Sequence, residues 1–250
     1  MSSEDVQSLC AQGQQLLAAR EYLDAERILA CAEREAYRLR DWDTLGRLYM
    51  PLQETRRQRR QRCCEGPISL NLISQGPDDV IVGRQVVENY THGQLLVAGW
   101  GTIEPALQVR KLQGRFGLYV DVFLAAAYPL IDGGLAIVIV PHEQAVLPVV
   151  LPRRLADFRG LLQTGCIVVR AAELPQEPRV NDQELLARLR GWWEAMHLPF
   201  LYAARETRDP HKRIDAYRKA IRVDYACELA HQELSATARE LARITARENP

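Results

Sequence analysis

Residues 9–32 read LCAQGQQLLAAREYLDAERILACA, and their spacing decides the fold of the N-terminal part of this chain. Small residues stand at Gly13 and Ala25, on either side of a short turn near Arg20, and would let two helices approach closely. Apolar residues recur around them at helical spacing: Leu9, Leu16, Tyr22, Leu29 and Ala32. The stretch therefore predicts a helical hairpin in which Gly13 faces Ala25.

Helical character continues to about residue 62. We expect helices over residues 4–19 and 22–38, and a third helix for which Asp43 is the N-cap. The alternation of small and large residues in the first two helices resembles the tetratricopeptide repeat, a helix–turn–helix unit of about 34 residues that is used mainly to bind other proteins. Three helices make only one and a half repeats, so they must pack against something else.

A second segment of similar pattern lies near the C-terminus. Asp209–Pro210 is a strong helix start, because an N-cap residue precedes a proline at the first helical position. The residues that resemble the repeat here are Tyr217, Ala220, Leu234 and Ala238. Arg213 departs from the pattern, since the repeat has a small residue at that point. The resemblance implies helical, protein-binding elements at both ends of the chain.

The composition excludes several classes of protein. Its 250 residues carry no formal net charge, so no global field directs the chain toward nucleic acid or an anionic membrane. No apolar run reaches the roughly 18 residues of a membrane span. The N-terminus lacks the apolar core of a signal peptide. Six cysteines, none of them in a CxxC pair, indicate reduced thiols in the cytoplasm.

The middle of the chain differs in composition from its ends: it has short runs of β-branched residues separated by Gly and Pro. The candidate strands are Ile68–Ile73, Val80–Val87, Gln94–Ala98, Leu118–Leu124, Leu135–Val140, Val146–Leu151 and Cys166–Arg170. Helices are expected over residues 104–114 and 152–162. This alternation predicts an α/β domain. We expect a mixed sheet, because no helix fits between the first two strands, and Leu135–Val140 reads as a central strand.

The sequence thus predicts three segments. Residues 1–64 form a tetratricopeptide-like helical region, residues 65–178 an α/β domain, and residues 179–250 a second helical region of the same kind.

A glycine turn is the first candidate ligand site. Gly99, Gly101 and Thr102 follow a predicted strand and precede a predicted helix, where backbone N–H groups could hold a phosphate or carboxylate. His142 and Glu143 follow the most apolar strand and would lie near this turn if the strands are parallel neighbours. The alternative is that the glycines serve a tight turn alone and that His142 and Glu143 are loop residues in solvent.

Charged residues offer two further features. Arg56, Arg59 and Arg60 lie close to one helix face and could bind phosphate, RNA or an acidic peptide, or could form a solvated helix end. No aromatic residue is interleaved with them for base stacking, so we do not expect nucleic acid as a partner. Asp121 interrupts an apolar strand, where an unpaired carboxylate is costly. An arginine partner such as Arg115 would make it structural, whereas a position facing a crevice would make it functional.

The sequence carries no motif of a known catalytic or metal site, and we expect neither a cofactor nor a metal ion. We expect a non-enzymatic interaction or scaffold protein that binds another protein, or a second copy of itself, through its helical surfaces. The alternative is a small-molecule or nucleotide-binding α/β protein, with or without enzymatic activity, whose pocket lies at the carboxyl ends of the strands.

Overall fold

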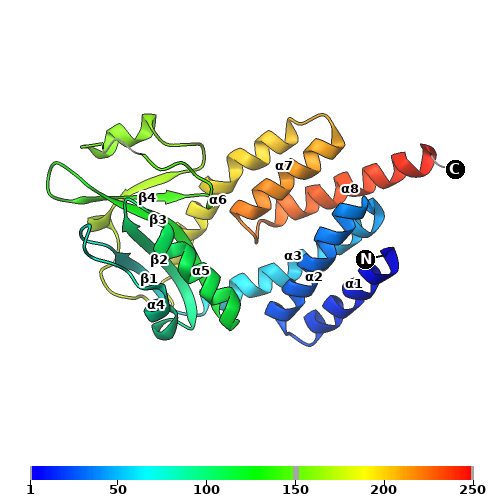
Figure 1. Cartoon of the computed structure of the whole chain (residues 1–250), viewed down its shortest axis with the longest axis horizontal. Helices are drawn as coiled ribbons and strands as arrows, with labels where there is room; N and C mark the ends of the chain where they lie inside the picture. Colours follow the sequence, from blue (N-terminus) through cyan, green and yellow to red (C-terminus); the bar gives the residue numbers. More distant parts are fainter. Residues whose placement is uncertain (1, 149–151, 249–250) are drawn as a thin grey trace. The chain divides into compact units, whose positions relative to one another are not determined.

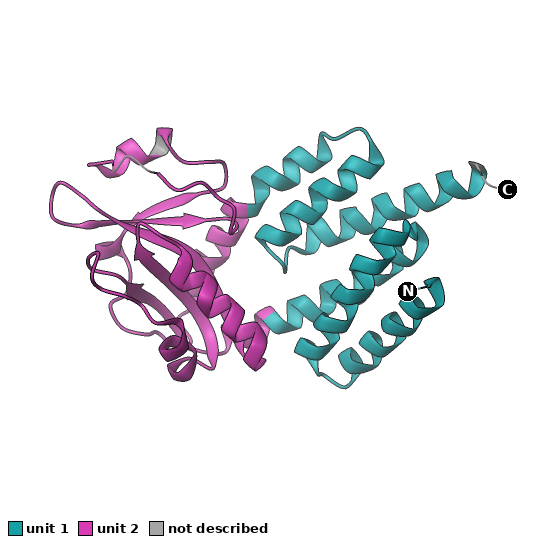
Figure 2. Cartoon of the chain, in the orientation of Figure 1, with its two compact units in different colours: residues 1–59, 197–250 teal, residues 60–196 magenta. Residues whose placement is uncertain are grey.

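A computed structural model describes residues 2–148 and 152–248 of the chain. The chain forms two compact units, coloured separately in Figure 2. The helical unit comprises residues 1–59 and 197–250, and the sheet unit comprises residues 60–196. The boundaries between the units fall inside two long helices, α3 (Trp42–Cys64) and α6 (Gln183–Arg205).

The helical unit contains α1 (Ser3–Ala18), α2 (Tyr22–Leu39), α7 (Pro210–Val223) and α8 (Glu228–Glu248), together with parts of α3 and α6. As Figure 1 shows, α1 packs against α2, and α7 against α8. Local sequence sets the helix starts. Ser2 caps α1 in a capping box, and the Asp209 carboxylate caps α7 by accepting from the backbone of His211. For α3 the cap is Asp41, whose carboxylate accepts from the Thr44 N–H at 3.0 Å, and not Asp43.

The predicted close approach of α1 and α2 occurs at Gly13, but its partner is Leu29. A Cβ atom on Gly13 would lie 2.5 Å from Leu29 Cγ. Leu29 is fully buried, and so is Ala25, the residue that the sequence pattern places opposite Gly13. The larger side chain fills the space beside the glycine, because only a residue without a Cβ leaves room for an isobutyl group there.

One apolar core joins helices from both ends of the chain. Its buried members include Leu29 of α2, Leu45 of α3, Leu201 of α6, Tyr217 of α7 and Leu234 of α8. Residues 1–59 and 197–250, which lie within the predicted helical segments 1–64 and 179–250, therefore belong to one compact unit. The tetratricopeptide resemblance of these segments stays a prediction.

Five strands in the described part of the chain form one mixed sheet in the order β1-β2-β3-β4-β5. Strands β1, β2 and β3 are parallel, whereas β4 is antiparallel to both β3 and β5. The bounds are Ile68–Ile73 (β1), His92–Trp100 (β2), Tyr119–Pro129 (β3), Leu135–Val140 (β4) and Ile167–Arg170 (β5). The expected α/β fold with a mixed sheet is confirmed, and β1 and β4 have the predicted bounds.

Three predicted elements are wrong. The expected strand Val80–Val87 is instead a loop followed by the helix α4 (Gly83–Asn89), which makes the crossover between the parallel strands β1 and β2. No strand covers residues 146–148 of the expected strand Val146–Leu151, and residues 149–151 lie outside the described part of the chain. The expected helix over residues 152–162 is reduced to a 3₁₀ helix at Leu155–Gly160.

Both faces of the sheet are covered. On one face, Val122 and Leu124 of β3 belong to the same core cluster as Val109 of α5 (Glu104–Phe116), which crosses this face in Figure 1. On the other face, Phe123 packs against two adjacent tryptophans of α6: it stacks on Trp193 with 4.5 Å between ring centroids and meets Trp192 edge-on. Both tryptophans are therefore core residues. None of the helices that the structure describes is long and apolar enough to cross a membrane.

The contact at Gly13 yields a prediction about stability. Gly13→Ala should lower the free energy of unfolding by about 1–3 kcal/mol, because the new methyl group overlaps buried Leu29. The measurement is urea unfolding followed by far-ultraviolet circular dichroism.

A double-mutant cycle provides the control. In a Leu29→Ala background the overlap is gone, so Gly13→Ala should be neutral or stabilising by up to about 1 kcal/mol, as expected of alanine in a helix. If Gly13→Ala lowers the free energy of unfolding equally in both backgrounds, the helices do not meet at Gly13 and Leu29.

Candidate binding cleft

A cleft of about 430 Å³ opens on the helical unit between α2, α3 and α7. This volume falls in the range of ligand pockets, about 300–1,000 Å³. Four arginines and one glutamate are among its lining residues, which are Ala30, Glu33, Arg34, Tyr49, Arg56, Arg218, Ile221 and Arg222. We call it the arginine cleft. Positive charge dominates its wall, although the chain as a whole has no formal net charge.

Glu33 organises one side of the cleft. Its carboxylate accepts a hydrogen bond from the Tyr49 hydroxyl at 2.7 Å and pairs with the Arg218 guanidinium at 2.8 Å. Arg218 also lies over the ring of Tyr37, 3.8 Å from its centroid. Burial and the nearby Glu33 carboxylate hold the pKa of Tyr49 well above its usual value, so this hydroxyl remains a donor. These contacts hold Arg218 in one orientation.

Arg56 of α3 is fixed by two partners. Its guanidinium pairs with Glu26 at 3.0 Å and lies 3.0 Å from Nε2 of His231. The other ring nitrogen of His231 donates to the Cys227 carbonyl at 2.8 Å. Burial, reinforced by the charge of Arg56, lowers the pKa of His231 to about 3. His231 is therefore neutral, with its proton on Nδ1 and Nε2 accepting from Arg56.

The two remaining arginines are exposed. Arg34 and Arg222 form no ion pair with any acid in the described part of the chain. Arg222 donates from Nε to the backbone carbonyl of Arg218, at 3.4 Å. The cleft thus has inner arginines that are already neutralised and exposed arginines whose charge is available to a ligand.

Sequence reasoning missed this cleft because its residues come from helices far apart in the chain. The only local signal was on α7, where Arg218 and Arg222 are four residues apart and so lie on one face of the helix. Nothing in the sequence indicates that this face meets Arg34 of α2.

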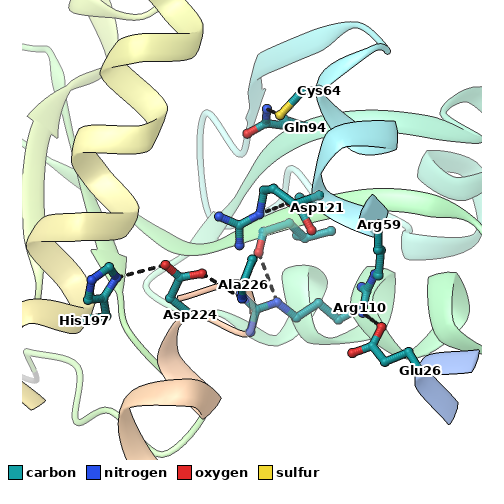
Figure 3. A network of polar contacts seen from close by, with 11 residues as sticks. Glu26, Arg59, Cys64, Gln94, Arg110, Asp121, His197, Asp224 and Ala226 are labelled. Carbon is teal, nitrogen blue, oxygen red and sulfur yellow. Dashed lines mark hydrogen bonds and ion pairs between the residues drawn. The ribbon is translucent and has the colours of Figure 1, made fainter. Parts of the chain in front are cut away.

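The three arginines of the predicted basic patch form ion pairs, and Arg56 also lines the arginine cleft. Arg56 and Arg59 both pair with Glu26, a contact drawn for Arg59 in Figure 3, and Arg59 also lies over the Tyr225 ring. Arg60 pairs with buried Asp121 at 2.8 Å and lies over the Trp193 indole. These side chains are at most 17% exposed. They are structural ion pairs, so neither a solvated helix end nor an RNA-binding surface describes them.

Asp121 has the arginine partner that its position in β3 requires, but that partner is Arg60 and not Arg115. The Asp121 side chain is only 2% exposed. Arg115 is exposed and lies near the Phe116 ring instead. The buried carboxylate is therefore explained by a structural pair at the end of α3.

Backbone contacts shape the glycine turn. A Cβ on Gly99 would lie 2.7 Å from the Thr102 carbonyl oxygen, so the backbone itself excludes a side chain. Gly101 has φ +62°, a left-handed conformation that favours glycine, and its N–H donates to Ala127. The Thr102 hydroxyl accepts from the Glu104 N–H, which reduces the number of donors open to an anion. Each glycine is accounted for without a ligand.

His142 and Glu143 are not near this turn. The expectation required the preceding strand to be parallel to its neighbours, and β4 is antiparallel to β3. Trp100, at the end of β2, pairs with Ala127, whereas Val140, at the end of β4, pairs with Leu124. The chain therefore leaves β4 toward the opposite ends of the parallel strands β2 and β3. The five residues of the candidate ligand site do not converge.

A group that could hold a metal ion lies in the helical unit. The ligand atoms of His197, Asp224 and Cys227 all lie within 4.8 Å of one another. Burial alone would lower the pKa of His197, but hydrogen bonds to Asp224 and Cys227 outweigh it and raise this pKa to about 10. Sequence spacing did not reveal the group, because His197 is on α6 and the other two flank the turn between α7 and α8.

The state of His231 predicts how stability depends on pH. Its folded pKa, about 3, lies below the ordinary value of 6.5, so the unfolded chain binds an extra proton between these values. The free energy of unfolding should therefore fall as the pH is lowered below 6.5, by up to about 1.4 kcal/mol per pH unit from this group. His231→Gln, which keeps a donor and an acceptor, should remove this part of the slope in urea unfolding between pH 6.5 and 5. An unchanged slope would show that His231 is not buried as a neutral ring.

The glycine turn gives a separate test of the pocket alternative. Gly101→Asn should preserve the fold, because asparagine tolerates a positive φ and a Cβ here meets no atom within 4 Å. We expect no thermal shift with nucleotides, dinucleotides or sugar phosphates for either protein, whereas a ligand at 100 times its Kd would add about 2.7 kcal/mol. A shift seen with the parent and lost in Gly101→Asn would favour a ligand site at the turn.

Comparison of this chain with protein-family models, with curated proteins and with solved structures gives no significant match.

Proposed function

We propose that this protein is a non-catalytic interaction protein whose helical unit binds an acidic segment of a partner protein in the arginine cleft. The observation that carries the proposal is the pair Arg34 and Arg222, two exposed guanidinium groups beside a cleft of about 430 Å³ with no acidic partner among the described residues. Guanidinium groups bind carboxylates in two-point hydrogen bonds, which makes acidic side chains their natural ligands.

The inner contacts of the cleft support the same proposal. Arg218 is held by Glu33 and Tyr37, and Arg56 by Glu26 and His231. A ligand therefore meets groups that are already ordered, and binding loses little side-chain entropy. Because Arg218 and Arg56 are paired with Glu33 and Glu26, the positive charge available to a ligand comes from Arg34 and Arg222.

A peptide fits the cleft better than a nucleic acid. Single-stranded nucleic acid is bound by aromatic platforms as well as positive charge. The tyrosine that lines this cleft, Tyr49, is 1% exposed and donates its hydroxyl to Glu33, so its ring is not open for stacking. A zero net charge also provides no long-range attraction for a polyanion.

Charge reversal at the exposed arginines tests the proposal. A fluorescent hexaglutamate peptide should bind the full chain in an anisotropy titration, with an affinity that decreases as salt is added. Arg34→Glu/Arg222→Glu should weaken this binding about tenfold or more, equivalent to about 1.4 kcal/mol. Both residues are exposed, so the fold should be retained, as circular dichroism can check.

Three controls make the outcome specific. Arg208→Glu/Arg247→Glu changes the net charge equally on exposed residues of the same unit that do not line the cleft, and should bind as the parent does. A hexaglutamine peptide should not bind. Equal loss of binding in both double variants, or binding of hexaglutamine as strong as of hexaglutamate, would contradict the proposal. Displacement of the peptide by an equal concentration of oligothymidylate would indicate nucleic acid instead.

A further inference from the structure

Three metal-ligating side chains converge in the helical unit from three different elements. His197 comes from α6, Asp224 ends α7, and Cys227 immediately precedes α8, as Figure 3 shows for the first two. His197 Nδ1 lies 2.9 Å from an Asp224 carboxylate oxygen. The three ligand atoms are all within 4.8 Å of one another, so a single ion could contact all three.

This arrangement suits a cation better than nucleophilic catalysis. In a Cys–His–Asp catalytic group the imidazole stands between the sulfur and the carboxylate, whereas here all three ligand atoms are mutually close. The group is also buried: Cys227 is 5% exposed, and the side chain of Asp224 is 6% exposed. A substrate would not reach the sulfur, but a single ion and a water molecule are small enough.

We propose that His197, Asp224 and Cys227 bind one Zn²⁺ ion. Zinc is the common divalent ion that accepts thiolate, imidazole and carboxylate together. Its bond lengths, about 2.0–2.3 Å, place ligand atoms about 3–4 Å apart in a tetrahedron. The three side chains need to move only slightly to bring their ligand atoms to these separations. Metal binding requires Cys227 as a thiolate and His197 as a neutral imidazole, so it releases protons to solvent, and water supplies the fourth ligand.

The backbone already holds two of the ligands in place. The Cys227 N–H donates to the Asp224 carbonyl at 3.0 Å, and the Ala226 N–H donates to the Asp224 carboxylate at 3.1 Å. The second contact would remain as outer-shell support for a metal-bound carboxylate. The spacing Asp-x₂-Cys is the same as that of paired ligands in structural zinc sites. His231 further anchors this turn through the Cys227 carbonyl.

The consequence of such a site is a cross-link within the helical unit. The ion would fasten α6 to the turn between α7 and α8, using residues that do not line the arginine cleft. Zinc would then stabilise the helical unit independently of the proposed peptide binding.

Cobalt substitution of the full chain tests the site. Metal-free protein prepared with chelator should bind one equivalent of Co²⁺, with a near-ultraviolet thiolate-to-cobalt band and visible bands of tetrahedral intensity that Zn²⁺ abolishes by displacement. Cys227→Ser should lose the thiolate band and weaken Zn²⁺ binding by at least the 10- to 100-fold typical of lost outer-shell contacts. Asp224→Asn should weaken binding while the thiolate band remains.

A matched cysteine control excludes unrelated thiols. Cys64→Ser alters a half-buried cysteine outside the group and should keep the full cobalt spectrum. Zn²⁺ should also raise the melting temperature of the parent and of Cys64→Ser, but not of Cys227→Ser. The proposal is overturned if the parent gives no thiolate band with excess Co²⁺, a measurement that does not depend on the folding of any variant. It is also overturned if the band survives in Cys227→Ser.

Discussion

The helical unit depends on one constraint: helices from the two ends of the chain must bury their apolar faces against each other. Leu45 near the N-terminus and Leu234 near the C-terminus belong to the same buried core. A buried hydrogen bond accompanies this packing, since the Ser235 hydroxyl donates to the Gly46 carbonyl at 2.6 Å. Neither end has enough helices to form a core alone. The arginine cleft depends on this packing too, because α2 and α3 supply one part of its wall and α7 the other.

Electrostatics then separate structural arginines from available ones. Arg56, Arg59 and Arg60 are largely buried and paired with Glu26 or Asp121, and removing one partner of such a pair costs about 3–5 kcal/mol because it leaves a charge uncompensated. Arg34 and Arg222 are exposed and unpaired with acids among the described residues, so their charge contributes little to stability and is free for recognition. This division explains how a chain without net charge can present a basic site.

Sequence reasoning succeeded where the signal was local. Periodic apolar residues and N-caps predicted the helices, and the uninterrupted apolar run Leu135–Val140 predicted β4. It failed at Val80–Val87, where β-branched residues suggested a strand but the crossover from β1 to β2 required a helix. It also failed where distant segments meet. The direction of β4, the pairing of Asp121 with Arg60, the cleft between α2 and α7, and the group around His197 all depend on contacts between residues far apart in sequence.

The central claim is that both ends of the chain form one cooperative helical unit. Hydrogen exchange followed by mass spectrometry on full-length Leu234→Ala tests it most directly, because this substitution in α8 should cost about 2–5 kcal/mol in the shared core. The account predicts that exchange accelerates in α2 and α3 as much as in α7 and α8, since these helices open together. Faster exchange confined to α7 and α8, with α2 and α3 as protected as in the parent, would contradict it.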